Sequence, residues 1–337
     1  MTSGHEDFRS RVGAGVTPFH TDAGATIRLA KQAEELGYGR FGSAEGWTHD
    51  AVVLLTQIAG LTSRIGLATS VLPVWSRTPG AIAMAAASLQ RASGGRFALG
   101  LGASSPPLVE GLHGLVWNRP VERMRATVVA VRALLAGGRV PLERDDVRPL
   151  RLGVPVEPPV PILLAALAPA SVRLAGELAD EWVPFLWARG RLADGRALLA
   201  EGESRAEDAG ATVVATSVPL AIAGDEETAR AIAAGWLLAY LTRMGPLYPR
   251  MLHDQFGFAR EVDALLEAND GDGPPRLPAE AERLADEVTL MATYDEAPQA
   301  IRRWLEAGSD RIDLVLPLGL PEEQLHEMLE AAARQAE

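Results

Sequence analysis

Residues 64–73 have the sequence Arg-Ile-Gly-Leu-Ala-Thr-Ser-Val-Leu-Pro, an apolar run that passes into small and hydroxyl side chains. Residues 93–105, Ser-Gly-Gly-Arg-Phe-Ala-Leu-Gly-Leu-Gly-Ala-Ser-Ser, repeat this pattern. Between the two runs, Arg77-Thr-Pro79 opens a segment of helical length. Two buried strands joined by a helix predict neighbouring strands of a parallel sheet. Small residues at the carboxyl ends of such strands leave room for a flat ligand.

The same alternation extends in both directions along the chain. Strands are predicted at residues 13–16, 38–43, 65–71, 97–101, 161–166, 181–185, 213–222 and 311–317. Helices are predicted at 25–36, 52–61, 79–89, 120–135, 171–178, 229–240 and 321–335, where apolar residues recur at helical spacing. Eight strand–helix units favour an α/β fold of the closed (β/α)8 TIM-barrel type, with residues 1–337 as a single domain.

Two segments depart from the simple repeat and predict insertions after strands four and seven. Residues 138–161 are rich in Pro, Arg and Asp and predict an exposed excursion. Residues 242–278 contain Gly-Pro and Gly-Asp-Gly-Pro-Pro turns. We expect this second excursion to lie over the barrel mouth, where loops carry function.

Composition excludes several classes of function. The 337 residues are 47% hydrophobic and carry a net charge of −12, which argues against nucleic acid or an anionic membrane surface as a partner. The absence of Cys excludes disulfides and thiolate ligands, and the histidines lack metal-like spacing, so no metal is predicted. With no secretion signal and no long apolar run, we expect a cytoplasmic protein that acts on a small-molecule substrate.

An ordered series of motifs resembles the bacterial luciferase-like superfamily. Within it, the chain is similar to the branch that depends on the deazaflavin coenzyme F420 and includes methylenetetrahydromethanopterin reductase. The resemblance covers residues 12–318 and depends on the order and spacing of nine short motifs, because each alone is weak. They lie at residues 33–38, 43–45, 59–65, 69–71, 77–79, 93–96, 100–102, 161–166 and 178–180.

The resemblance implies an oxidoreductase that moves a hydride between coenzyme F420 and a small organic metabolite, reducing a C=C or C=N bond. One alternative is a two-component monooxygenase that uses reduced flavin mononucleotide (FMN). Another is a catalytically silent flavin-binding barrel. Relatives also imply a homodimer formed through the helices beside strands two and three.

The resemblance further implies where the cofactor binds. It predicts a bulge with a non-prolyl cis peptide between Ser70 and Val71, which would support the flavin ring. Backbone N–H groups at the start of the helix after strand five are expected to hold the cofactor phosphate. The competing explanation for the small residues at the ends of strands four and five is close packing between strand and helix. The predicted cofactor-binding residues are Ser43, Ser70, Val71, Gly102, Ala103, Ser104, Ala165, Ala166, Leu167 and Ala168.

Glu45, which follows the second strand, is the predicted catalytic residue. Burial at the barrel mouth would raise its pKa and fit it to proton transfer. His49 is a second candidate for proton relay. Sugar-phosphate dehydrogenases of the branch have His where this chain has Glu45, and Glu where it has Ser105, which disfavours oxidation of a sugar phosphate. The competing explanation for Glu45 and His49 is that each only contacts a neighbouring loop and takes no part in catalysis.

Aromatic residues predict an apolar wall for the substrate. Trp47 lies on the loop after strand two, and a larger group clusters toward loops six and seven. Ordinary packing between barrel and helices is the competing explanation for each of them. The predicted wall consists of Trp47, Trp187 and Trp236, with Trp182, Phe185, Tyr240, Tyr248 and Phe256 as further members of the cluster.

Overall fold

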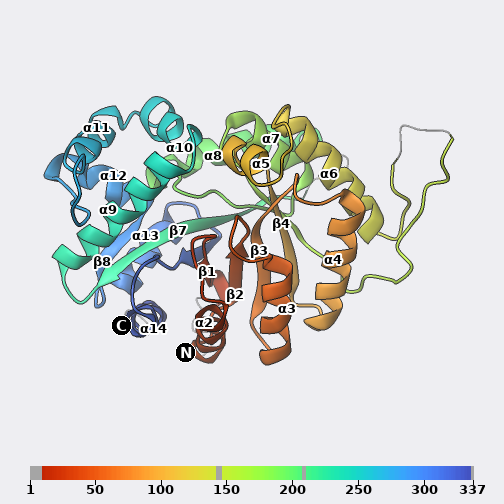
Figure 1. Cartoon of the computed structure of the whole chain (residues 1–337), viewed down its shortest axis with the longest axis horizontal. Helices are drawn as coiled ribbons and strands as arrows, with labels where there is room; N and C mark the ends of the chain where they lie inside the picture. The colour runs from red at the N-terminus through yellow and green to blue at the C-terminus, as the bar shows by residue number, and fades with distance from the viewer. Residues whose placement is uncertain (1–9, 142–145, 207–209, 335–337) are drawn as a thin grey trace.

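A closed parallel barrel forms the centre of the molecule (Figure 1). The computed structural model describes residues 10–141, 146–206 and 210–334. The sheet has nine strands in the order β6-β5-β4-β3-β2-β1-β9-β7-β8, and an additional pairing of β6 with β7 closes the ring. Because β8 pairs only with β7, the other eight strands make the barrel, which confirms the predicted fold. The strands are β1 (Val12–Val16), β2 (Arg40–Ala44), β3 (Gly66–Pro73), β4 (Phe97–Gly102), β5 (Ile162–Ala165), β6 (Glu181–Trp182), β7 (Val213–Ala223), β8 (Leu290–Thr293) and β9 (Arg311–Val315).

Helices surround the barrel, and several begin at side chains that cap their first turn. The Asp22 carboxylate accepts a hydrogen bond from the Ala25 N–H, and Asp50 and Thr78 do the same for the next two helices. The helices are α2 (Ala23–Leu36), α3 (Ala51–Leu61), α4 (Pro79–Ala92), α5 (Pro106–Gly111), α6 (Pro120–Leu135), α7 (Pro169–Leu178), α8 (Leu192–Glu203), α9 (Glu226–Arg243), α10 (Leu247–Arg250), α11 (Ala259–Glu267), α12 (Glu282–Val288), α13 (Ala297–Glu306) and α14 (Glu322–Ala333), with short 3-10 turns at Arg189–Arg191 and Ala279–Ala281 and a π turn at Met251–Gln255.

The two unusual segments lie in different places. Residues 146–161 contain no helix or strand and, with residues 136–141, project from the side of the molecule beyond α6 (Figure 1). The other segment belongs to the long connection from β7 to β9. This connection carries α9 to α13 and β8, and forms a lobe beside the barrel (Figure 1).

A buried ionic cluster closes the amino-terminal end of the barrel. The Arg40 guanidinium donates to Asp313 at 2.6 Å and to Glu181 at 2.7 Å. Burial alone would lower the pKa of Arg40, but the two carboxylates outweigh it and raise the pKa. Gly13 makes room for the cluster, because a Cβ atom there would lie 2.1 Å from Asp313 Oδ1. This cluster therefore occupies the barrel interior below the carboxyl ends of the strands.

Candidate active site

A cavity of about 630 Å³ lies at the carboxyl ends of the barrel strands. All eight barrel strands or the loops that follow them contribute to its lining, as expected for the functional end of this fold. The lining includes the ends of four strands with the loops that follow them: Gly15–Pro18 from β1, Ala44–Trp47 from β2, Gly102–Leu108 from β4 and Ala165–Ala168 from β5. It also includes Ser70, Val71 and Pro73 of β3, Val183 and Phe185 after β6, Ser217 of β7, and Asp313 and Val315 of β9. Residues Arg243 to Arg250 of the long connection add a further side.

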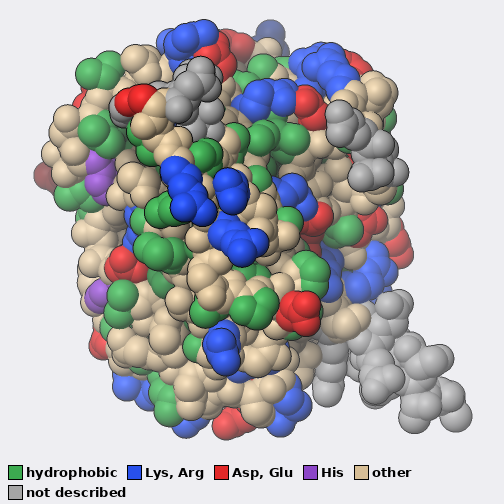
Figure 2. Space-filling view, turned by 90° about the vertical axis from the view of Figure 1, so that its right-hand side faces the viewer, with side chains coloured by type: hydrophobic (Ala, Val, Ile, Leu, Met, Phe, Trp, Pro, Cys, Tyr) green, Lys and Arg blue, Asp and Glu red, His purple; other side chains and the backbone are tan. Residues whose placement is uncertain are grey.

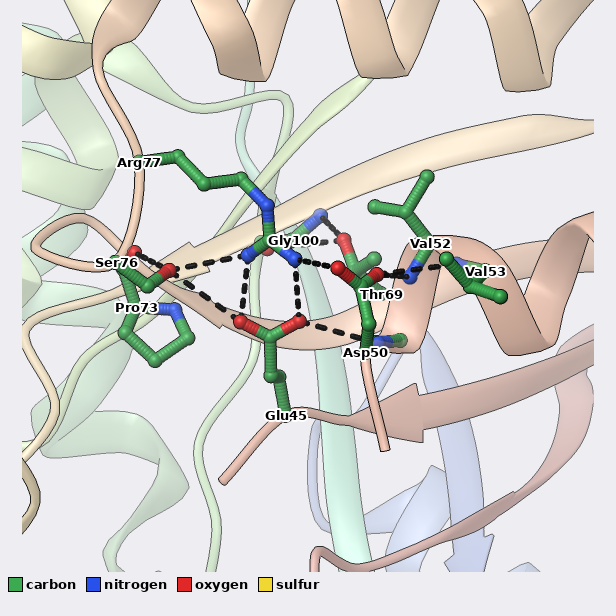
Figure 3. A network of polar contacts seen from close by, with 10 residues as sticks. Glu45, Asp50, Val52, Val53, Thr69, Pro73, Ser76, Arg77 and Gly100 are labelled. Atoms are coloured by element: carbon green, nitrogen blue, oxygen red, sulfur yellow. Dashed lines mark hydrogen bonds and ion pairs between the residues drawn. The ribbon is translucent and has the colours of Figure 1, made fainter. Parts of the chain in front are cut away.

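A bulge interrupts β3 at Ser70. The pairing of β3 with β4 shifts between Thr69 and Leu72, and the pairing with β2 shifts at the same point. The Thr69 hydroxyl replaces the lost strand pairing, because it donates to the Gly100 carbonyl at 3.0 Å and accepts from the Gly100 N–H at 2.9 Å (Figure 3). In the described residues the one cis peptide bond is Glu157–Pro158. The expected bulge is therefore present, but the expected cis peptide between Ser70 and Val71 is not.

Small residues make one face of the cavity. Gly102 is required for close packing, because a Cβ atom there would lie 2.6 Å from Val71 Cγ2. Ser104 has a φ of 61°, a left-handed conformation that costs a serine about 1 kcal/mol or more. All of the predicted cofactor-binding residues line the cavity except Ser43, which is buried beside it, and most belong to this face. We call Val71, Gly102, Ala103, Ser104 and Ala165–Ala168 the small-residue face.

Two indoles hold this face in position. The Nε1–H groups of Trp75 and Trp117 both donate to the Ala103 carbonyl, at 2.9 and 3.2 Å. Trp117 also lines the cavity. Sequence reasoning missed both residues, because nothing in a single sequence shows that two loops meet at one carbonyl group.

The start of α7 opens onto the same cavity. Ala168 is the N-cap and has no side chain to bond the first turn, and Pro169 follows it. Ser171 also borders the cavity, with its hydroxyl donating to the Ala168 carbonyl at 2.8 Å. Unsatisfied N–H groups of a first helical turn favour an anion. Binding of a cofactor phosphate here stays a prediction.

Glu45 lies in the lining and is held by an ionic network (Figure 3). The Arg77 guanidinium donates to both of its carboxylate oxygens, at 2.6 and 2.9 Å, and also pairs with Asp50. The Ala51 N–H donates to Glu45 at 3.1 Å and the Ser76 hydroxyl donates at 3.3 Å. With only 8% of its surface exposed, Glu45 ties the loop after β2 to the loop after β3. Its catalytic role stays a prediction, and Arg77 is a functional candidate that sequence reasoning did not single out.

His49 does not join the site. Its Nε2 atom lies 2.9 Å from the Thr21 carbonyl oxygen, and the residue is outside the cavity lining. A residue on the outer side of this loop has no access to a ligand in the barrel. The structure thus places Glu45 at the cavity but not its predicted relay partner.

An aromatic face lies across the cavity from part of the small-residue face. The rings of Phe185, Tyr240 and Tyr248 contact each other, with centroids 4.8 Å apart for Phe185–Tyr240 and 4.9 Å for Tyr240–Tyr248. Trp47 joins the lining from the loop after β2 and is 47% exposed. We call Trp47, Phe185, Tyr240 and Tyr248 the aromatic face.

The prediction that Trp187 and Trp236 belong to the substrate wall is wrong. Both are fully buried outside the lining. Their indole N–H groups donate to backbone carbonyls, Trp187 to Arg191 at 2.9 Å and Trp236 to Leu220 at 3.1 Å. A buried indole needs such a partner, so these two residues are part of the core.

The cavity can hold a planar ligand between its two faces. A flat ring fits against the small-residue face because most of its side chains are Gly, Ala or Ser, and a second apolar molecule then contacts the aromatic face. Within the described ranges, no group of three or more His, Cys, Asp or Glu residues could hold a metal ion. No helix in those ranges is long and apolar enough to cross a membrane.

Comparisons with known proteins agree with this geometry. The family model described as "Luciferase-like monooxygenase" matches residues 7–311. A Mycobacterium tuberculosis protein named as a putative coenzyme F420-dependent oxidoreductase is 29% identical over an alignment 309 residues long, which covers 83% of this chain and 87% of that protein.

Solved structures show the same fold. The coenzyme F420 dependent tetrahydromethanopterin reductase from Methanopyrus kandleri superposes with a TM-score of 0.73 at 21% identity, covering 95% of this chain and 96% of the other. The monooxygenase RslO1 from Streptomyces bottropensis superposes with a TM-score of 0.69 at 22% identity, covering 96% and 97%. The fold is therefore shared by F420-dependent reductases and by monooxygenases.

Proposed function

We propose, from the premise that this chain belongs to the luciferase-like monooxygenase family, that it is an oxidoreductase that depends on coenzyme F420. Its reaction would transfer a hydride between the deazaflavin and a small organic metabolite and reduce a C=C or C=N bond. The observation that carries the proposal is the similarity to the mycobacterial F420-dependent oxidoreductase, which extends over 309 residues rather than over one motif.

The residues of the cavity fit a flat cofactor. Gly102 packs so closely on Val71 that a Cβ atom would lie 2.6 Å from Val71 Cγ2, and the small-residue face continues through the single methyl groups of Ala165 and Ala166. We propose that this face and the bulge at Ser70 hold the ring, and that the start of α7 holds the phosphate. When bound there, the deazaflavin would supply or accept the hydride.

Glu45 is the proposed group that holds the transferred proton. It borders the cavity, and its hydrogen bonds to Arg77 and Ala51 fix the position of both oxygens. Glu45→Gln should slow turnover sharply while leaving cofactor affinity nearly unchanged. Unchanged turnover in this variant would remove Glu45 from that role.

The decisive experiment is a fluorescence titration of the purified protein with coenzyme F420 and, separately, with FMN. Binding of F420 and not FMN supports the proposal. Gly102→Ala should weaken F420 binding by about tenfold, because overpacking by one methyl group costs about 1–3 kcal/mol. Gly60→Ala is the matched control, since nothing lies within 4 Å of the added methyl group on α3.

The monooxygenase is the second candidate, favoured by the structural likeness to RslO1. FMN binding together with oxygen uptake that requires reduced FMN would establish it in place of the first candidate. Binding of neither cofactor would count against both candidates and would support a structural barrel without turnover.

A homodimer is also proposed. Helix α3 exposes two large apolar side chains, with Val53 57% and Leu61 56% exposed. Light scattering after size-exclusion chromatography tests this proposal.

A further inference from the structure

Two arginines border the cavity and have no partner in the described part of the chain. Arg243 is the last residue of α9 and Arg250 is the last residue of α10. Both are exposed, and neither guanidinium group makes a hydrogen bond or ion pair with another described residue. Both guanidinium groups are therefore available to a ligand.

The other charged residues of the lining are both in ion pairs. Glu45 is paired with Arg77, and Asp313 is paired with Arg40. The charged groups of the lining without a described partner are therefore the two guanidinium groups, although the whole chain has a net charge of −12. A guanidinium group matches the geometry of carboxylate and phosphate, so this rim favours an anionic group.

The aromatic face continues directly into this rim. Tyr240 lies one helical turn before Arg243 on α9, and Tyr248 lies on α10 with Arg250. The two hydroxyl groups have no hydrogen-bond partner among the described residues, and burial raises the pKa of both phenols, which keeps them neutral. This side of the cavity is thus apolar inside and cationic at its outer edge.

We propose that the substrate is an amphipathic acid, with an apolar body of ring or chain type and one carboxylate or phosphate group. The body would lie against Phe185, Tyr240 and Tyr248, and Arg243 and Arg250 would bind the anionic group. The inference rests on the proposed function, in which the small-residue face holds the cofactor.

The acidic side chain of the cofactor is the other possible source of an anion at this rim. The order of the strands favours the substrate, rather than the cofactor, as the source of the anionic group. The turn proposed for the cofactor phosphate follows β5, whereas both arginines follow β7, and β6 lies between these strands. The arginines also adjoin the aromatic face rather than the small-residue face.

Two fluorescent probes test the inference without knowledge of the substrate. 8-Anilino-1-naphthalenesulfonate has aromatic rings and an anionic group, and N-phenyl-1-naphthylamine has the same rings without the charge. Arg243→Gln/Arg250→Gln should bind the anionic probe at least about tenfold more weakly, since a charge-assisted hydrogen bond contributes about that factor. Its affinity for the neutral probe should stay within about twofold, because the aromatic face is intact.

A matched double variant controls for anion binding elsewhere. Figure 2 shows a group of basic side chains near the middle of the face from which residues 146–161 project. Arg148→Gln/Arg151→Gln removes two exposed arginines from that segment, outside the cavity lining. This variant should bind both probes as the unchanged protein does.

Four results would overturn the inference. The first is that both double variants lose affinity for the anionic probe equally, and the second is that neither loses it. The third is that Arg243→Gln/Arg250→Gln loses affinity for both probes equally. A fourth is weaker F420 binding in that variant that disappears with a coenzyme lacking its glutamyl tail, since the arginines would then serve the cofactor. The proposed function and this inference can fail separately. If the protein binds no cofactor but Arg243→Gln/Arg250→Gln still weakens only the anionic probe, the proposed function is wrong and the amphipathic acid remains the ligand class.

Discussion

Replacement of Arg77 by Met tests whether the ionic network holds the barrel mouth together. The substitution keeps most of the side-chain volume and removes the guanidinium group. Glu45 would then keep only the Ala51 N–H and the Ser76 hydroxyl as donors, at 3.1 and 3.3 Å. A carboxylate that is 8% exposed would lose its positive partner.

The expected cost is about 3 kcal/mol. Removal of one partner from a buried ion pair costs about 3–5 kcal/mol. The lower end applies because 17% of the Arg77 side chain is exposed and Glu45 keeps two other donors. At about 2.1 cal/mol/K per residue, unfolding of 337 residues has an entropy of about 0.7 kcal/mol/K. The melting temperature should therefore fall by about 4 °C.

Thermal and urea unfolding of Arg77→Met, Glu45→Gln and the double variant measure the coupling between the two side chains. The double variant should be less destabilised than the two single costs combined, by about 2 kcal/mol. Arg173→Met is the matched control, because Arg173 pairs with the half-exposed Glu201 and such pairs contribute at most about 1 kcal/mol. Equal costs for Arg77→Met and Arg173→Met, or additive costs in the double variant, would refute the reasoning.

Three further predictions address other parts of the barrel mouth. Thr69→Val should lower the free energy of unfolding in urea by about 2–4 kcal/mol, because it removes the hydroxyl group that bonds the Gly100 N–H and carbonyl. Thr56→Val is the control and should cost less than about 0.5 kcal/mol, because the Thr56 hydroxyl bonds the Val52 carbonyl on the surface of α3. Similar costs for the two variants would contradict the account of the bulge. Ser104→Gly should raise the melting temperature by about 1–2 °C, since glycine adopts the φ of 61° without strain, and an unchanged or lower melting temperature would show that Ser104 is not strained. Burial lowers the pKa of His20 below its usual 6.5, so the unfolded chain binds a proton there first as the pH falls, and the protein should lose stability below about pH 6.5. His20→Gln should reduce this loss of stability in unfolding measured from pH 7.5 to 5.5. An identical pH profile for the variant would contradict the role of His20.

The barrel strands were predictable because each is a short apolar run between turn signals. The strand that was missed, β8, has four residues and no alternation of apolar and polar side chains. Helix α8 was missed for a different reason, because it contains Gly195 and Gly202. A Cβ atom at Gly202 would lie 2.0 Å from the Arg173 carbonyl oxygen, so this glycine allows α7 and α8 to pack closely rather than ending a helix.

The candidate site was predictable where it follows the strands. Gly102 and Ala165 lie at strand ends, and the barrel topology alone brings them together. Residues from the long connections were not predictable in the same way, because the path of a connection depends on tertiary packing. Hence Trp187 was placed at the cavity although it is buried, and Arg243 and Arg250 were not recognised.

The long strand β7 suggests how new specificities arise in this architecture. Its first residues pair with β6, the next pair with β9, and Leu220–Ala223 extend past the ring to pair with β8. The connection between Ala223 and Arg311, which carries both rim arginines and both tyrosines of the aromatic face, therefore begins at the end of a strand whose first residues already belong to the closed barrel. If the rim binds the substrate as proposed, a chimaera that receives this lobe from a relative should acquire the donor's substrate preference, while the small-residue face on β3 to β5 stays untouched.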